Sequence, residues 1–318
     1  SRPGRRGRPP RRRLSLGGQR GHVMRAELSP VVVLGATGQL GRALIATFGD
    51  RAVALDRARA DLTRLVGTLE LLDDIAPAAV INAAAYTRVD DAEKEESLAN
   101  QINGAAPASL ARHCATRKIP FVHFSTDYVF SGAGDQPWLE TDSPAPINAY
   151  GRSKLAGERG VAAAGGDSLI FRTSWVYDGV GRNFLTTMLR LGRDHATLDV
   201  VDDQIGAPTY APSLAGAVAR AIEQASFAPG IYHLCGAGTC SWFEFAKAIF
   251  ESARARGAAL AVESLRPVVS ADYPTTASRP LNSRLRTAKA QTAFGIALPH
   301  WRDDLEVCLD GMLGKPAR

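Results

Sequence analysis

The sequence predicts an α/β protein with a Rossmann-type, doubly wound parallel sheet and a smaller, partly interleaved C-terminal domain. Short β-branched runs alternate with helix-like segments as far as Ser125, and a glycine-rich turn follows the first run. The chain of 318 residues is also longer than a typical single domain. The expected division is residues 30–173 plus about 205–237 for the sheet, and about 174–204 plus 238–318 for the second domain.

Residues 1–29 are expected to lie outside the fold as an arginine-rich extension. Seven arginines and no acidic residue occur in residues 1–13, and without them the net charge of +6 falls close to neutral. The extension is compatible with a solvated arm, a targeting segment, or translated sequence ahead of a start near Met24, which we prefer. Because the basic charge is confined there, we expect no nucleic-acid partner for the folded part.

The lengths of the apolar runs and the spacing of the cysteines indicate the cellular compartment in which the protein folds. No run of about 18 apolar residues occurs, so we expect neither a membrane-spanning helix nor a membrane partner. The four cysteines, Cys114, Cys235, Cys240 and Cys308, form no CxxC pair. This scatter favours core packing in a reducing compartment, and therefore a cytoplasmic protein without a metal site.

The first strand and its glycine turn predict a dinucleotide site. The run Val31–Leu34 leads into the sequence GATGQLG at 35–41, and the helix-like Arg42–Phe48 follows. A glycine turn between a strand and a helix lets a pyrophosphate approach the backbone at the helix N-terminus. The expected cofactor-binding residues of this turn are Gly35, Thr37, Gly38, Gln39 and Leu40.

The second strand, Ala52–Leu55, is expected to end at the adenosine part of the cofactor. An acid in this position takes the ribose hydroxyls of NAD, whereas an adjacent arginine can hold the 2′-phosphate of NADP. Both Asp56 and Arg57 are present, so the sequence leaves this preference open. Asp61 and Leu62 are expected to border the adenine, although Asp61 could equally be a plain helix cap.

The third strand, predicted at 79–85, ends in small residues against which a flat cofactor can lie. These are Ala83, Ala84 and Ala85, and Tyr86 after them is expected to line the nicotinamide side. An amphipathic helix is predicted from Asn100 to Lys118.

The fourth strand carries the expected chemistry. The apolar run Ile119–Phe124 is followed by small polar residues, and strand ends of this kind hold site residues in open α/β sheets. Downstream, Tyr150 and Lys154 stand four residues apart in a helix-like segment, so they share one helix face. The ammonium group is expected to lower the pKa of the tyrosine, which could then protonate a carbonyl oxygen while hydride arrives at the carbon.

The remaining pattern is less regular. Strands are predicted at 169–171, 198–201 and 230–234, and helices at 183–191, 212–225 and 242–256, whereas 262–287 has no regular pattern. Trp175 follows a strand end and Gln204 lies in a polar loop at 202–209, both in places typical of substrate contacts. Arg279 and Arg284 flank Asn282, which suits a diphosphate, although surface ion pairing explains the arginines as well.

These stretches resemble the extended short-chain dehydrogenase/reductases and, within them, the family of dTDP-4-dehydrorhamnose reductases. The resemblance runs from about Val31 to Trp301. GATGQLG and YGRSKLAGE are shared by many reductases, whereas FSTDYVFSG at 124–132, RTSWVY at 172–177 and DDQIGAPT at 202–209 are more specific. NAAAYTRVDDAE at 82–93 and RPLNSRL at 279–285 complete the pattern.

The resemblance implies a reduction of the C4 keto group of dTDP-4-keto-L-rhamnose by NADPH, or by NADH. Tyr150 would be the general acid, Lys154 would hold the nicotinamide ribose, and Thr126 would hydrogen-bond the substrate carbonyl. The substrate-binding residues implied in this way are Thr87, Val89, Asp90, Thr126, Asp127, Tyr128, Trp175, Gln204, Arg279, Asn282 and Arg284.

One position departs from the family pattern. Some members hold Mg²⁺ at a dimer interface with a glutamate two residues after the last glycine of the loop, where this chain has Ala43. An alanine offers no oxygen ligand, so the sequence argues against Mg²⁺ and against a dimer that depends on it. A homodimer of another kind stays open.

Two other functions fit parts of the pattern. A nucleotide-sugar epimerase or dehydratase would share the fold, but dehydratases usually carry further acids beside the catalytic threonine, and no glutamate follows Asp127. A non-catalytic NADP-binding regulatory subunit would also share the fold, but Thr126, Tyr150 and Lys154 are all present.

Overall fold

The structure is a computed structural model that describes residues 28–224 and 228–315. Apart from residues 28 and 29, the expected arginine-rich extension lies outside the described residues, as does Ala225, the last residue of one predicted helix. None of the helices in the described part combines the length and the apolar character that a membrane crossing requires.

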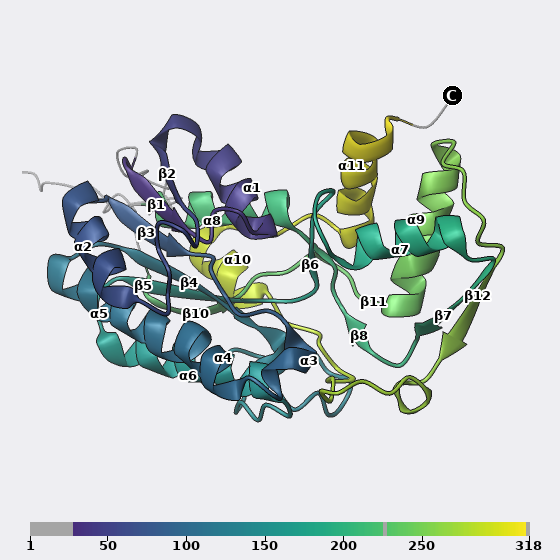
Figure 1. Ribbon diagram of the computed structural model, residues 1–318, viewed down its shortest axis with the longest axis horizontal. Helices are drawn as coiled ribbons and strands as arrows, with labels where there is room; N and C mark the ends of the chain where they lie inside the picture. The colour runs from purple at the N-terminus through teal and green to yellow at the C-terminus, as the bar shows by residue number, and fades with distance from the viewer. Residues whose placement is uncertain (1–27, 225–227, 316–318) are drawn as a thin grey trace, which may run out of the picture.

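A six-stranded, all-parallel sheet forms the larger lobe and confirms the predicted doubly wound fold (Figure 1). Its order is β2-β1-β3-β4-β5-β10, so the chain reverses direction across the sheet at β1 and β3. Ligands of open α/β sheets bind outside the carboxyl ends of the strands at such a reversal. The strands are β1 (Val31–Leu34), β2 (Ala52–Leu55), β3 (Ala79–Asn82), β4 (Phe121–Thr126), β5 (Ser168–Thr173) and β10 (Gly230–His233).

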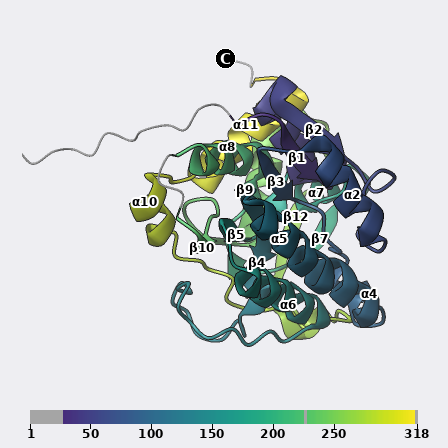
Figure 2. The same ribbon diagram turned by 90° about the vertical axis from the view of Figure 1, so that its left-hand side faces the viewer.

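Helices cover both faces of the sheet, which is why its strands are apolar on both sides (Figure 2). Val31 and Val33 pack with the helices of one face, whereas Val32 and Leu34 pack with those of the other. The first face is covered by α1 (Gln39–Phe48), α8 (Ala211–Ile222) and α10 (Ala288–Phe294), and the second by α2 (Leu65–Ile75), α5 (Ala106–Arg117) and α6 (Ala149–Ala164).

Several predicted boundaries in this lobe were wrong, and three of them have a clear local cause or change the element. Helix α2 begins at Leu65 because the Asp61 carboxylate accepts hydrogen bonds from the backbone and hydroxyl of Thr63 and closes a turn instead. Strand β3 stops at Asn82, whose side chain accepts a hydrogen bond from Ala84 N. The helix predicted from Asn100 is divided into α4 (Glu96–Asn100), a π-helical turn (Gln101–Ala105) and α5, and α3 (Val89–Ala92) precedes it.

The smaller lobe has its own core between three helices and a pair of parallel strands (Figure 1). The helices are α7 (Phe184–Asp194), α9 (Trp242–Ala255) and α11 (Trp301–Leu313), and the strands are β7 (Thr197–Val201) and β12 (Ser264–Val268). The segment 262–287 was therefore wrongly predicted to be wholly irregular. Shorter elements are β6 (Val176–Tyr177), β8 (Ile205–Gly206), β9 (Thr209–Tyr210), β11 (Cys240–Ser241) and the 3₁₀ turns Gly49–Arg51, Asp127–Val129 and Ser270–Asp272.

The division between the lobes stays a proposal, with one change. Phe294 and the following Ile296 and Leu298 pack in the core between the sheet and α8, not in the core of the smaller lobe. We therefore propose that residues 288–298 belong to the larger lobe.

A buried ion pair joins helix α6 to strand β5. Two nitrogens of Arg172 donate to the two carboxylate oxygens of Glu158 at 2.8 and 2.7 Å, and both side chains are only 2% exposed. The guanidinium also lies 4.9 Å from the centre of the Phe130 ring. Such a pair contributes little net stability, but removal of one partner strands the other charge in the core.

Arg172→Met should therefore lower the free energy of unfolding by roughly 3–5 kcal/mol, measured by urea denaturation. Arg266→Gln is the matched control, because its pair with Asp199 is 65% and 41% exposed, and solvent screening makes such a pair contribute far less than a buried one. The double change Glu158→Leu with Arg172→Met should recover much of the loss. An Arg172→Met cost as small as that of the control would contradict the prediction.

Candidate active site

A cleft of about 830 Å³ opens at the carboxyl ends of β1, β3, β4 and β5. This is where the reversal in strand order predicts a ligand, and the volume suits a large one. The cleft brings together predicted residues from segments far apart in the sequence. Those that line it are Gly35, Thr37, Gly38, Gln39, Leu40, Arg57, Asp61, Leu62, Ala83, Ala84, Ala85, Tyr86, Thr87, Thr126, Asp127, Tyr150, Lys154 and Trp175.

The glycine loop has the geometry that a dinucleotide needs. Gly35 has φ of 78°, and a side chain there would meet the backbone of Ala84 at 2.6 Å. A side chain at Gly41 would collide with the carbonyl of Gly35, so helix α1 can approach β1 only with glycine at this position. Among the described residues, the Gly35 carbonyl, at 3.3 Å, is the only group within 4 Å of a side chain built at Gly38, which leaves that side of the loop open to a phosphate. The residues present therefore fit a dinucleotide.

At the end of β2 the two predicted ribose-binding residues differ in position. The Asp56 carboxylate accepts a hydrogen bond from Arg59 N at 3.1 Å and does not line the cleft. Arg57 lines the cleft, and its side chain is 79% exposed, with Asp61 as a distant partner at 4.0 Å. An anion at this end of the cleft would meet the guanidinium before the carboxylate.

Asn103 is a residue that sequence reasoning missed. It is 1% exposed and lies in the π-helical turn. Its side chain exchanges hydrogen bonds with the backbone of Tyr86 at 2.8 and 2.9 Å and donates to the Ser153 hydroxyl at 3.0 Å. It thereby fixes the strand end next to helix α6. π-helical turns are frequent at functional sites, but no pattern in the sequence revealed this one.

Tyr150 and Lys154 lie on the first turns of α6, which Asn148 caps by accepting a hydrogen bond from Gly151 N. The buried Lys154 Nζ donates to the carbonyl of Phe124 at 2.6 Å, which ties the helix to the end of β4. Burial lowers the pKa of Lys154 to about 8.

The expectation that Lys154 lowers the pKa of Tyr150 was wrong for this structure. Burial raises the pKa of Tyr150, and the nearby Asp127 carboxylate raises it further, while a hydrogen bond with Thr126 offsets this in part. Because Lys154 is committed to the Phe124 carbonyl, its charge is not directed at the phenol. The tyrosine therefore stays protonated and able to donate a proton.

Thr126 and Asp127 form the polar centre of the cleft. The Thr126 hydroxyl donates to Asp127 Oδ1 at 2.9 Å and accepts from Tyr128 N at 3.2 Å. Asp127 Oδ2 is buried and has no hydrogen-bond partner among the described residues. Burial raises the pKa of Asp127 to about 6, against the opposing effect of the nearby Ser283 hydroxyl and of the hydrogen bond from Thr126. Ser283 lies between the two arginines at 279 and 284 but was not itself among the predicted site residues.

Trp175 reaches the cleft from a strained backbone. Its φ of 47° is unusual for a bulky residue and costs on the order of 1–3 kcal/mol. A hydrogen bond from Thr209 N to its carbonyl and stacking of its ring on Trp242, with centroids 3.5 Å apart, hold it there. The strain supports the prediction that Trp175 contacts substrate.

Eight predicted residues do not line the cleft, and several have protein partners instead. Arg279 forms a two-point ion pair with Asp90 at 2.7 and 3.1 Å. The Asn282 side chain, 1% exposed, donates to the carbonyl of Gln136, and Gln204 bonds to Ser270 and Trp242. The eight are Asp56, Val89, Asp90, Tyr128, Gln204, Arg279, Asn282 and Arg284.

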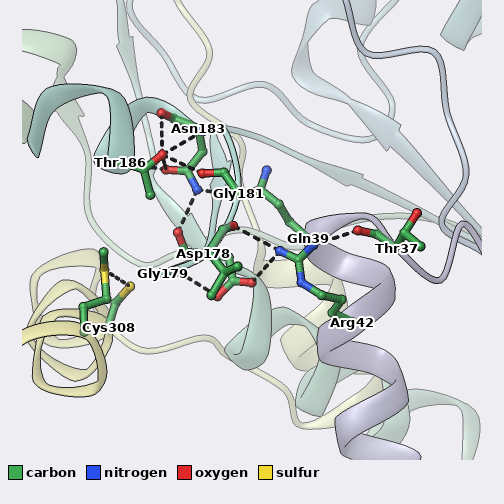
Figure 3. A network of polar contacts seen from close by, with 11 residues as sticks. Thr37, Gln39, Arg42, Asp178, Gly179, Gly181, Asn183, Thr186 and Cys308 are labelled. Carbon is green, nitrogen blue, oxygen red and sulfur yellow. Dashed lines mark hydrogen bonds and ion pairs between the residues drawn. The ribbon is translucent and has the colours of Figure 1, made fainter. Parts of the chain in front are cut away.

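The cleft also has lining residues that the sequence did not indicate. Among them are Arg42, Gly181 and Arg182, the last two from the segment that leads into the smaller lobe's helix α7. Figure 3 shows Arg42 reaching from α1 towards Asp178 and Gly179. Ala43, which follows Arg42, stands where some reductases have a glutamate, and it gives no support to a magnesium site.

Comparisons with known proteins agree with this geometry. Residues 29–313 match the family described as the RmlD substrate binding domain. A dTDP-4-dehydrorhamnose reductase of Burkholderia thailandensis is 44% identical over 299 residues, which are 90% of this chain and 99% of the relative. The chain belongs to the dTDP-4-dehydrorhamnose reductase family. The Escherichia coli K12 enzyme of the same name is 44% identical over 86% of this chain and 94% of its own.

Solved structures of this family have the same fold. The dTDP-4-dehydrorhamnose reductase of Bacillus anthracis, solved in complex with NADP, aligns with a TM-score of 0.82 at 36% identity and covers 88% of this chain and 98% of its own. The Clostridium acetobutylicum reductase aligns with a TM-score of 0.83 at 35% identity, over 89% and 99%. The resemblance read from the sequence is confirmed.

Asp127 predicts a pH dependence of stability. The pKa of Asp127 is raised in the folded protein, so protonation of this group stabilises the fold. This stabilisation is complete below the ordinary pKa of 3.8 and is lost as pH rises through about 6. Relative to Asp127→Asn, the wild-type free energy of unfolding should fall by up to roughly 3 kcal/mol between pH 4 and pH 7. Denaturation at both pH values measures this. Asp135→Asn, at an exposed site, is the control, and an equal Asp127→Asn effect at both pH values would contradict the prediction.

Proposed function

We propose that this enzyme reduces the C4 keto group of dTDP-4-dehydrorhamnose to give dTDP-L-rhamnose, with Tyr150 as the proton donor. The observation that carries the proposal is the convergence of Thr126, Tyr150 and Lys154 in the same cleft as the glycine loop. Family membership supports the reaction, and the protonated state of Tyr150 supports its role.

NADPH is the reductant, and when bound it supplies the hydride that reaches C4. The glycine loop would hold the pyrophosphate and the three alanines after β3 would lie against the nicotinamide side. Arg57 would bind the 2′-phosphate, because it lines the cleft while Asp56 bonds to Arg59 N. This arrangement favours NADPH over NADH, with NADH as a poorer alternative. No role for Mg²⁺ is proposed.

The substrate carbonyl would lie between the hydroxyls of Thr126 and Tyr150. Thr126 donates to Asp127 in the structure, and it would redirect this hydrogen to the carbonyl oxygen. Tyr150 would then release its proton to the same oxygen as hydride arrives. Lys154, fixed on the Phe124 carbonyl, keeps two further N–H donors for the cofactor ribose.

We place this activity in the cytoplasm. The cysteines Cys114, Cys235, Cys240 and Cys308 are all free and buried, which suits a reducing compartment and their expected role in core packing. The homodimer raised by the sequence stays a prediction.

Tyr150→Phe tests the proton donor. The rate of NADPH oxidation with dTDP-4-keto-L-rhamnose should fall ~10²–10⁴-fold while NADPH still binds, because only the acid is lost. Tyr273→Phe, at a half-exposed site outside the cleft, should keep the wild-type rate. A Tyr150→Phe variant with an undiminished rate would exclude this assignment, and a wild type that binds NADPH without turnover would favour a regulatory subunit.

Lys154 predicts an alkaline limit to activity. Its pKa of about 8 means that kcat/KM for NADPH should fall as pH rises through about 8, because the free enzyme then loses the ammonium charge. In Lys154→Arg the positive charge persists at higher pH. The alkaline fall in kcat/KM should therefore shift to higher pH, even if the overall rate is low. The pH dependence of the NADPH Kd, followed by fluorescence, checks the same group without turnover. If kcat/KM for Lys154→Arg still falls near the same pH as in the wild type, Lys154 is not the group that binds NADPH through its charge.

A further inference from the structure

The smaller lobe contributes to the cofactor end of the cleft through the bridging loop, residues 178–183. Gly181 and Arg182 of this loop line the cleft together with the glycine loop and Arg57. Trp175, from the same connection, lies at the catalytic end. One short segment therefore reaches both the predicted sugar site and the predicted phosphate site.

Polar contacts hold the bridging loop against helix α1 (Figure 3). Arg42 donates to Asp178 Oδ2 at 3.2 Å and to the carbonyl of Val180 at 3.0 Å. Its other terminal nitrogen donates to the carbonyl of Thr37, within the glycine loop, at 2.7 Å. The Arg42 guanidinium thus connects the bridging loop directly to the turn that would hold the pyrophosphate.

The far end of the loop is fixed as well. Asn183 caps helix α7 by accepting a hydrogen bond from Thr186 N at 3.0 Å, while its own N–H bonds to the Thr186 hydroxyl. Its amide also donates to Gln39 Oε1 at 2.8 Å and to the carbonyl of Asp178 at 2.7 Å. Because Gln39 is the first residue of α1, one hydrogen bond joins the N-cap of α7 to the start of a helix in the other lobe.

Arg182 stands out within this loop. Arg42 and Asn183 have protein partners, whereas Arg182 makes no hydrogen bond or ion pair with any residue in the described ranges, although it lines the cleft. A guanidinium offers paired donors that match phosphate oxygens. Its neighbour Gly181 lies against Arg42, and a side chain built there would come within 3.6 Å of Arg42 Nη2. Gly181 therefore lies beside the arginine that contacts the glycine loop, and Arg182 is the next residue in the chain.

We propose that Arg182 binds the pyrophosphate of the nicotinamide dinucleotide from the side of the smaller lobe, and that Asp178 and Asn183 position it. The inference rests on the proposed function in taking NADPH as the ligand of this cleft. It assigns different phosphates to the two cations: the pyrophosphate to Arg182 and the 2′-phosphate to Arg57. Cofactor binding then depends on how the lobes meet.

The test is direct binding of NADPH and NADH to the purified full-length chain without sugar substrate, by fluorescence titration. Arg182→Gln should raise both Kd values about 5- to 50-fold, because both cofactors carry the pyrophosphate and a charge-assisted hydrogen bond is lost. Arg57→Gln should raise the NADPH Kd alone. Arg190→Gln, an exposed arginine on α7 outside the cleft, is the matched control and should leave both Kd values unchanged.

A double-mutant cycle tests the positioning part. Asp178→Asn should raise both Kd values several-fold in the wild type but should add nothing in the Arg182→Gln background, because it acts only through Arg182. A merely structural role of Asp178 would give additive effects, which would overturn the positioning claim.

The outcomes separate this inference from the proposed function. Unchanged Kd values in Arg182→Gln, with normal binding by the wild type, would overturn the inference alone. A loss confined to NADPH would assign Arg182 to the 2′-phosphate and overturn the pyrophosphate assignment. A wild type that binds neither cofactor would overturn the proposed function together with the inference.

Discussion

The buried pair between Glu158 and Arg172 is the contact on which the geometry of the site depends. It fixes helix α6 to strand β5 two turns after Tyr150 and one turn after Lys154. Arg172 also lies within 3.4 Å of a ring nitrogen of His233 in β10, so the pair links α6 to two strands. Ions so deeply buried are costly to desolvate, and an apolar contact could give the same stability. An apolar contact would not reproduce the fixed orientation that the two hydrogen bonds impose. The pair therefore sets the angle at which α6 presents its tyrosine and lysine to the cleft.

Parts of the site that lie within one continuous segment could be predicted from local sequence patterns. Glycines 35, 38 and 41 act within a single turn, and Tyr150 and Lys154 share one helix face, so their spacing alone placed them together. Arg279 and Asn282 could not be placed in this way. Their partners, Asp90 and the Gln136 carbonyl, are more than a hundred residues away in sequence and become neighbours only in the folded chain.

Electrostatic properties were harder to predict than positions. The spacing of Tyr150 and Lys154 indicated a lowered tyrosine pKa, yet burial dominates and the lysine is directed at a backbone carbonyl. Burial depends on how distant segments pack around the site, and Ser283, which acts on the pKa of Asp127, comes from a segment whose sequence shows no regular pattern. Asn103 was missed for a related reason, since its importance lies in two backbone groups of Tyr86 that carry no signature in the sequence.

The stacked rings of Trp175 and Trp242 make the intrinsic tryptophan fluorescence of the enzyme sensitive to events in the cleft. Trp175 lines the cleft, whereas Trp242 is the first residue of α9 in the smaller lobe, and the two rings are nearly parallel at 9°. Stacked indoles interact electronically, so their absorption and emission are sensitive to small changes in overlap. Any shift of one lobe against the other, or a sugar that displaces the Trp175 ring, would change this overlap. The intrinsic fluorescence of the unlabelled protein can therefore follow ligand entry in real time.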